Sequence, residues 1–171
     1  ETACVFDFTV EDIIGMALYN RKKEKTSSKE IIRHAMEELK ITDFSGRNIQ
    51  TLSGGERKMV FLARAVAQGV DTIILDEPTN HLDICHQLFL LNYLKQSGKT
   101  ILIVIHDLRL ASYYCDTLYL MEEGRVLSHG TPQKVLTRDH VEKVFGISGY
   151  MVEREDGEED FAIDFEKRIE N

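Results

Sequence analysis

Leu52-Ser53-Gly54-Gly55-Glu56 is followed by the apolar run Thr72-Ile73-Ile74-Leu75, which ends in the acidic pair Asp76-Glu77. Ser53 is a good N-cap, and the two glycines after it leave the first free N–H groups of a helix open to a phosphate. The apolar run predicts a buried parallel strand, and open α/β sheets bind ligands at the carboxyl ends of such strands. Together the two segments indicate a nucleotide site with carboxylates for Mg²⁺ and water.

The composition fits one domain with a sizeable core, because the 171 residues are 43% hydrophobic. A net charge of −8 argues against a general surface for nucleic acid, and the run Arg21-Lys22-Lys23-Lys25 is interpreted as a solvated helix end. The three cysteines are scattered, which predicts no disulfide framework and favours an intracellular protein. No apolar run is long enough to span a bilayer.

The chain changes character near residue 50. Before it, Thr9 with Asp12 and Ser27 with Glu30 have capping-box spacing ahead of apolar residues at helical intervals, which predicts a small helical subdomain. After it, strands alternate with helices, as in a parallel sheet. The expected elements are a helix from Ser53 to about Gln68, strands at 72–76, 100–105 and 117–121, helices at 83–96 and 107–115, and a hairpin at 122–125.

Residues 153–170 are strongly acidic but contain the alternating apolar residues Phe161, Ile163 and Phe165. This pattern predicts a loosely attached edge strand with a frayed end.

Several polar residues are placed for phosphate chemistry. Asp76 is the expected ligand of Mg²⁺, and Glu77 can polarise the water that attacks a terminal phosphate. His106 follows the strand at 100–105 and can hydrogen-bond that phosphate, although a lone histidine there is more often a packing residue. Asp83 can contact a neighbouring nucleotide site or can simply cap the helix at 83–96.

Ser97-Gly98-Lys99-Thr100 imitates the end of a phosphate-binding P-loop. The motif needs a glycine five residues before Gly98, where Tyr93 stands, and it must run from a strand into a helix. Here a helix is expected to run into a strand, so this segment is not a P-loop. The sequence Gly-x-x-x-x-Gly-Lys-[Ser/Thr] occurs nowhere in the chain.

The chain resembles the nucleotide-binding domain of ATP-binding cassette proteins to about residue 150. Residues 52–56 match that family's signature motif, Thr72–Asp76 the Walker B strand, Glu77 the catalytic glutamate, residues 78–83 the D-loop, and His106 the switch histidine. The resemblance implies two domains that sandwich two ATP molecules head to tail with Mg²⁺. Asp76 would then be the metal ligand, Glu77 and His106 the catalytic residues, and the residues touching nucleotide would be Ser53, Gly54, Gly55, Glu56 and Asp83.

The resemblance also implies a fold class and a domain plan. We expect an α/β protein, a partial P-loop NTPase core of the RecA-like type with a mostly parallel sheet plus the family's helical subdomain. Residues 1–50 would be that subdomain, 51–150 the second part of the ATPase core, and 151–171 an acidic C-terminal extension. The family's P-loop, adenine-stacking aromatic and Q-loop precede the helical subdomain, so we expect the chain alone to be inactive as an ATPase.

Two functions are compatible with these motifs. Residues 6–12, 108–111 and 121–136 look like the ATPase subunits of importers for iron-siderophore complexes, haem or cobalamin, which is the preferred interpretation. That interpretation implies a second ATPase subunit and a membrane permease as partners, no nucleic acid, and a peripheral location on the cytoplasmic face of the membrane. The alternative is a ribosome-associated translation factor of the same superfamily, because residues 77–83 also suit that class, although Leu108 stands where such factors usually have arginine and an aromatic.

Overall fold

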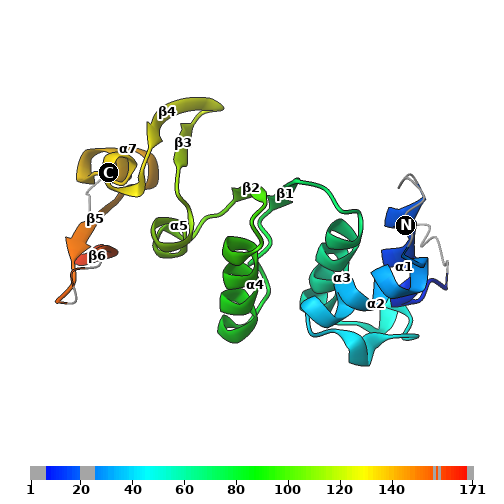
Figure 1. The fold of residues 1–171 in the computed structure, drawn as a ribbon. Helices are drawn as coiled ribbons and strands as arrows, with labels where there is room; N and C mark the ends of the chain where they lie inside the picture. The colour runs from blue at the N-terminus through cyan, green and yellow to red at the C-terminus, as the bar shows by residue number, and fades with distance from the viewer. Residues whose placement is uncertain (1–6, 20–25, 156, 158, 169–171) are drawn as a thin grey trace. The chain divides into compact units, whose positions relative to one another are not determined.

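The computed structural model describes residues 7–19, 26–155, 157 and 159–168 (Figure 1). The basic run Arg21-Lys22-Lys23-Lys25, Phe6 and Cys4 lie outside these residues. The chain divides into two compact units, Glu1–Ile103 and Val104–Asn171, which are described separately below. In the described part of the chain, no helix has both the length and the apolar composition needed to cross a membrane.

The first unit is built around helix α3 (Gly54–Ala67), which packs against α1 (Val10–Gly15) and α2 (Ser28–Glu38) (Figure 1). Short 3₁₀ turns at Met16–Leu18, Thr42–Phe44 and Ile49–Thr51 connect these helices. The buried face of α3 repeats at helical intervals and joins one apolar core with α1 and α2. Fully buried members of that core are Val10, Ile14, Leu39, Val60 and Ala63.

Each of these three helices begins with a capping box, which the sequence predicts at Thr9 and Ser27, whereas at Ser53 it predicts only the N-cap. Ser27 Oγ accepts a hydrogen bond from the Glu30 amide at 3.3 Å, and the Glu30 carboxylate accepts one from the Ser27 amide at 3.0 Å. Thr9 and Asp12 make the same reciprocal pair. Two amide groups that the first helical turn would leave unpaired are thereby satisfied at each start.

Strands β1 (Thr72–Asp76) and β2 (Thr100–Val104) form a two-stranded sheet and are joined by helix α4 (Ile84–Gln96). A helical crossover is the connection that parallel strands require. The α/β fold with a parallel sheet is confirmed. The expectation of a buried strand at 72–76 holds on one face and is wrong on the other, because Ile73 is 3% exposed whereas Ile74 is 72% exposed. Leu102 of β2 is also exposed, so the described residues cover one face of this sheet.

The second unit begins with α5 (Leu108–Tyr114) and an antiparallel hairpin of β3 (Leu118–Glu122) and β4 (Arg125–Gly130). The hairpin falls where the sequence predicts it. Its two loop residues, Glu123 and Gly124, have φ values of 47° and 75°, which suit a tight turn between twisted strands. The strand expected to continue the parallel sheet therefore pairs with β4, because a two-residue turn allows only antiparallel pairing.

Two helices, α6 (Pro132–Val135) and α7 (Arg138–Phe145), precede an antiparallel pair of β5 (Ile147–Glu153) and β6 (Glu159–Arg168). The loose attachment expected for the last strand is wrong. Phe161 of β6 is 1% exposed and packs with Leu136 and Val141 in the core of the second unit. One large aromatic ring thus anchors a strand that also carries four acidic residues.

We expect Phe161→Ala to lower the free energy of unfolding of the second unit by about 3–5 kcal/mol, because it removes a large buried ring and leaves a cavity. Val126→Ala, on a 53% exposed side chain of the same unit, is the control and should change stability by less than about 0.5 kcal/mol. Denaturant unfolding followed by circular dichroism measures both. Equal stability of the two variants would contradict the anchoring role of Phe161.

Candidate nucleotide-binding and catalytic site

The start of α3 is shaped by a third capping box. Ser53 Oγ accepts from the Glu56 amide at 3.2 Å, and the Glu56 carboxylate accepts from the Ser53 amide at 2.6 Å. The Ser53 backbone hydrogen bond is the main reason that the pKa of Glu56 lies below its usual value. Leu52 is buried beneath this turn, and Ser53 and Gly54 are exposed. The structure thus gives Glu56 a local role in fixing the helix start.

The two glycines of this start have different surroundings. A Cβ on Gly54 would meet no atom within 4 Å, whereas a Cβ on Gly55 would lie 2.9 Å from Leu82 Cδ2 and 3.6 Å from the His81 carbonyl oxygen. Gly54 therefore leaves open space before the helix N-terminus. Gly55 allows the turn that follows β1 to pack directly on α3.

The acidic pair lies at the end of β1, as the sequence predicts. Asp76 is exposed, and Glu77 is partly buried with a φ of 44°. Asn80 Nδ2 donates a hydrogen bond to the Glu77 carboxylate. A positive φ at a residue other than glycine is uncommon, and it persists where neighbouring contacts determine the conformation.

Lys58 provides such a contact from α3. Its ammonium donates to the Glu77 carbonyl oxygen at 2.8 Å and to the Asn80 carbonyl oxygen at 2.7 Å, and both bonds are partly buried. Sequence reasoning missed both Lys58 and the amide of Asn80. The available signal was weak, since Lys58 is one of several polar residues on a helix whose apolar face begins at Met59.

Asp83 is the N-cap of α4, where its carboxylate accepts from the His86 amide at 2.9 Å and lies 2.7 Å from His86 Nδ1. These hydrogen bonds, with the His86 backbone contribution the largest, lower the pKa of Asp83 from its usual value. The capping alternative for Asp83 is thus observed. Asp83 is also exposed, so its carboxylate is accessible to a ligand, and its contact with a nucleotide stays a proposal.

His106 belongs to the second unit, where it is exposed and immediately precedes Asp107, the N-cap of α5. Asp107 accepts from the Arg109 and Leu110 amides at 2.9 and 3.1 Å. Local hydrogen bonds thus fix the backbone that carries His106. The remaining predicted site residues, Ser53 to Glu56, Asp76, Glu77 and Asp83, all lie in the first unit.

The imitation P-loop connects α4 to β2, as the sequence indicates. Gly98 has a φ of 66°, and the Lys99 ammonium donates to the Val70 carbonyl oxygen at 2.6 Å. This lysine is engaged in joining two segments of the first unit, which is a structural role.

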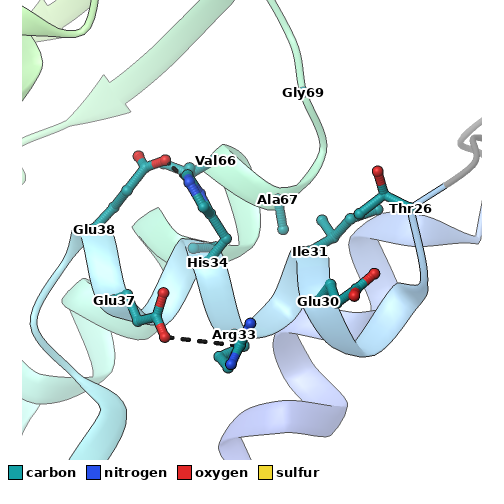
Figure 2. A pocket seen from close by; sticks show the side chains of 11 residues that line it. Thr26, Glu30, Ile31, Arg33, His34, Glu37, Glu38, Val66, Ala67 and Gly69 are labelled. Carbon is teal, nitrogen blue, oxygen red and sulfur yellow. Dashed lines mark ion pairs between the residues drawn. The ribbon is translucent and has the colours of Figure 1, made fainter.

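Two hollows lie on the helical part of the first unit. One, of about 390 Å³, is lined by α2 and the end of α3, and Figure 2 shows His34 and Glu38 pointing toward each other across its edge. His34 Nδ1 lies 2.7 Å from Glu38, which also accepts from the Tyr93 hydroxyl of α4 at 2.6 Å. The pKa of Tyr93 is raised, first by burial and then by this carboxylate.

The second hollow is a groove of about 1130 Å³ between α1 and α2. Its apolar lining residues include Phe8, Met16, Ile32 and Met36. Its acidic residues outnumber its basic ones: Asp7, Glu11, Asp12 and Glu37 against Lys29 and Arg33. We name this hollow the α1–α2 groove.

Comparison with known proteins places these features in a family. The family model described as ABC transporter matches residues 4–80, which include the α1–α2 groove residues, the glycine-rich start of α3 and the acidic end of β1. The iron(3+)-hydroxamate import ATP-binding protein FhuC of Bacillus subtilis is 41% identical over 126 residues, covering 71% of this chain and 47% of the relative. The chain belongs to the ABC transporter family. The hemin import ATP-binding protein HmuV of Pseudomonas fluorescens is 38% identical over 150 residues, covering 83% of this chain and 59% of that protein.

A solved ABC transporter chain in an inward-facing conformation has the same fold. It superposes with a TM-score of 0.80 at 22% identity, and the match covers 96% of this chain and 70% of that one. The chain spans about half the length of the curated relatives named above. The ABC family assignment and the α/β fold predicted from the sequence are both confirmed.

We expect Gly54→Ala to leave the free energy of unfolding unchanged or to raise it by up to about 1 kcal/mol, because alanine favours the helix and the space is open. Gly55→Ala should be less stable than Gly54→Ala by about 1–3 kcal/mol, since its methyl group displaces Leu82. Denaturant unfolding measures both variants. In the Leu82→Ala background the difference should shrink, and equal stability in the wild-type background would exclude the contact.

Proposed function

We propose that this chain forms the signature and catalytic-carboxylate part of the ATP-binding subunit of an importer for an iron complex, haem or cobalamin. The observation that carries the proposal is the direct contact, within one unit, between the glycine-rich start of α3 and the turn that follows Asp76 and Glu77. Two relatives at 38–41% identity that are import ATP-binding proteins support it.

The described residues fit ATP and Mg²⁺. The open space at Gly54 leaves room for phosphate oxygens beside the free amides of α3, and a helix of this length carries a positive partial charge at that end. The exposed Asp76 carboxylate is a hard oxygen ligand of the type that Mg²⁺ prefers. ATP supplies the phosphoryl group, and Mg²⁺ neutralises the charge that develops on it.

In this proposal each residue has a separate task. Asp76 holds the metal, and the Glu77 carboxylate orients and polarises the attacking water. His106 donates a hydrogen bond to the terminal phosphate. The residues that contact nucleotide held by a second, head-to-tail ATPase subunit are Ser53, Gly54, Gly55, Glu56 and Asp83, so one chain contributes half of each of two sites.

We expect the 171-residue chain by itself to release phosphate from Mg-ATP at the background rate. The sequence contains no Gly-x-x-x-x-Gly-Lys-[Ser/Thr], and so it offers no lysine and backbone cradle of that type for the β- and γ-phosphates. A sensitive phosphate-release assay measures the rate. A rate above background that Glu77→Gln abolishes would show the expectation to be wrong.

The α1–α2 groove fits a short cytoplasmic helix of a membrane permease. Apolar side chains line it, and its excess of carboxylates favours an amphipathic partner helix that carries basic residues. Such a contact would place the chain at the cytoplasmic face of the membrane. No observed feature favours the ribosome-associated alternative, which becomes an outcome of the test below.

We expect the full-length protein to co-purify with a polytopic permease and Met16→Glu to reduce the recovered permease at least tenfold. Met16 lines the groove and is 39% exposed, so a carboxylate there adds like charge to an acidic, partly apolar surface. Leu88→Glu is the control, because Leu88 is 40% exposed on α4 and does not line the groove. Sedimentation of the wild-type protein with ribosomes, without a permease, would refute the importer proposal.

A further inference from the structure

Lys58 of α3 contacts two residues of the turn after β1, which lie 19 and 22 residues farther along the chain. Its ammonium donates hydrogen bonds to the carbonyl oxygens of Glu77 and Asn80 at 2.8 and 2.7 Å. Two carbonyl dipoles that converge on one point repel each other unless a hydrogen-bond donor lies between them, and a cationic donor offsets the repulsion most strongly. The turn after β1 is thus arranged around a charge that α3 supplies.

The turn that Lys58 holds has an unusual backbone. Glu77 and His81 have φ values of 44° and 62°, a region that side chains other than glycine rarely adopt. Within the turn, the Asn80 amide donates to the Glu77 carbonyl oxygen at 3.2 Å. Gln87 of α4 donates to the Thr79 and Leu82 carbonyl oxygens at 3.0 and 3.2 Å. Contacts from both helices therefore fix a conformation that the local sequence disfavours.

The same contacts reach the Glu77 side chain. Asn80 Nδ2 donates to the Glu77 carboxylate, and the backbone of Asn80 is held by Lys58. The carboxylate is thus oriented by an amide whose own position depends on the ammonium. Lys58 lies one helical turn beyond Ser53 and Gly54, so it also ties this orientation to the position of the α3 N-terminus.

We propose that Lys58 is a positioning residue, whose ammonium holds the turn after β1 so that the Glu77 carboxylate keeps one orientation relative to the start of α3. This inference rests on the proposed function for the task of Glu77, but the geometry of the turn does not depend on it. Lys58 touches neither the nucleotide nor the attacking water in this scheme. Its contribution is to couple the helix start that faces phosphate to the carboxylate that activates water.

The test uses three single variants. Lys58→Met keeps the aliphatic stem and removes the charge, whereas Lys58→Gln keeps two N–H donors that can serve the two carbonyl oxygens. Arg64→Met is the matched control, because it removes one charge from an exposed position farther along the same helix.

Two measurements separate the inference from the proposed function. In the full-length protein, steady-state ATPase kinetics should show kcat reduced about 10- to 100-fold in Lys58→Met with KM for ATP unchanged, partial recovery in Lys58→Gln, and no change in Arg64→Met. In the 171-residue chain, amide hydrogen exchange should show faster exchange at Asn80 and Leu82 in Lys58→Met alone.

Each outcome decides. Unchanged exchange in Lys58→Met would overturn the inference, and so would an unchanged kcat in Lys58→Met or a loss of kcat that Arg64→Met reproduces. A variant that is only less stable would contain less folded enzyme. Active-site titration measures that amount, and kcat per folded molecule would then be unchanged. A wild-type protein without ATPase activity would refute the proposed function. Faster exchange in Lys58→Met would then still support the positioning of the turn by Lys58, but the catalytic purpose of that positioning would be refuted.

Discussion

The contact between the Lys58 ammonium and two carbonyl oxygens of the turn after β1 is the interaction on which the rest of the candidate site depends. Its geometry requires α3 to be fixed in place, and apolar packing does this. Val60 and Ala63 of α3 are completely buried against α1 and α2. Full burial of a side chain such as that of Val60 contributes about 1.5–3 kcal/mol. A shift of the helix would therefore cost part of the stability of this core. Packing of the apolar face of α3 therefore holds the polar groups near the N-terminus of that helix in place.

Strain and hydrogen bonding balance in the turn itself. Residues held at positive φ cost about 1–3 kcal/mol each, and Glu77 and His81 both adopt such values. A charge-assisted hydrogen bond contributes about 1.5–3 kcal/mol, so the two donated by Lys58 are of the right size to offset that cost. The turn is thus stable in this shape because α3 is there, and a carboxylate that is oriented before substrate arrives requires less rearrangement.

Much of the local structure could be predicted from the sequence. The capping boxes at Thr9 and Ser27, the N-cap at Ser53, the acidic end of β1 and the hairpin at Glu123-Gly124 all depend on residues within a few positions of one another. The family resemblance rested on the same short segments and is confirmed. The expectations that were wrong concern burial. Ile74 is exposed because one face of its sheet is not covered by the described residues, and Phe161 is buried because distant Leu136 and Val141 surround it.

The sequence by itself determined the helix starts at Thr9, Ser27 and Ser53, the alternation of strands and helices from residue 72 to the hairpin, and the presence of glycines and carboxylates suited to phosphate and metal. These follow from hydrogen bonds and steric limits that act over one helical turn or one strand. Tertiary structure alone decided that Gly55 must admit Leu82 and that Lys58 bridges two carbonyl groups. No local pattern marks such a lysine, because its partners lie 19 and 22 residues away and meet it only when α3 and β1 have packed into the same core.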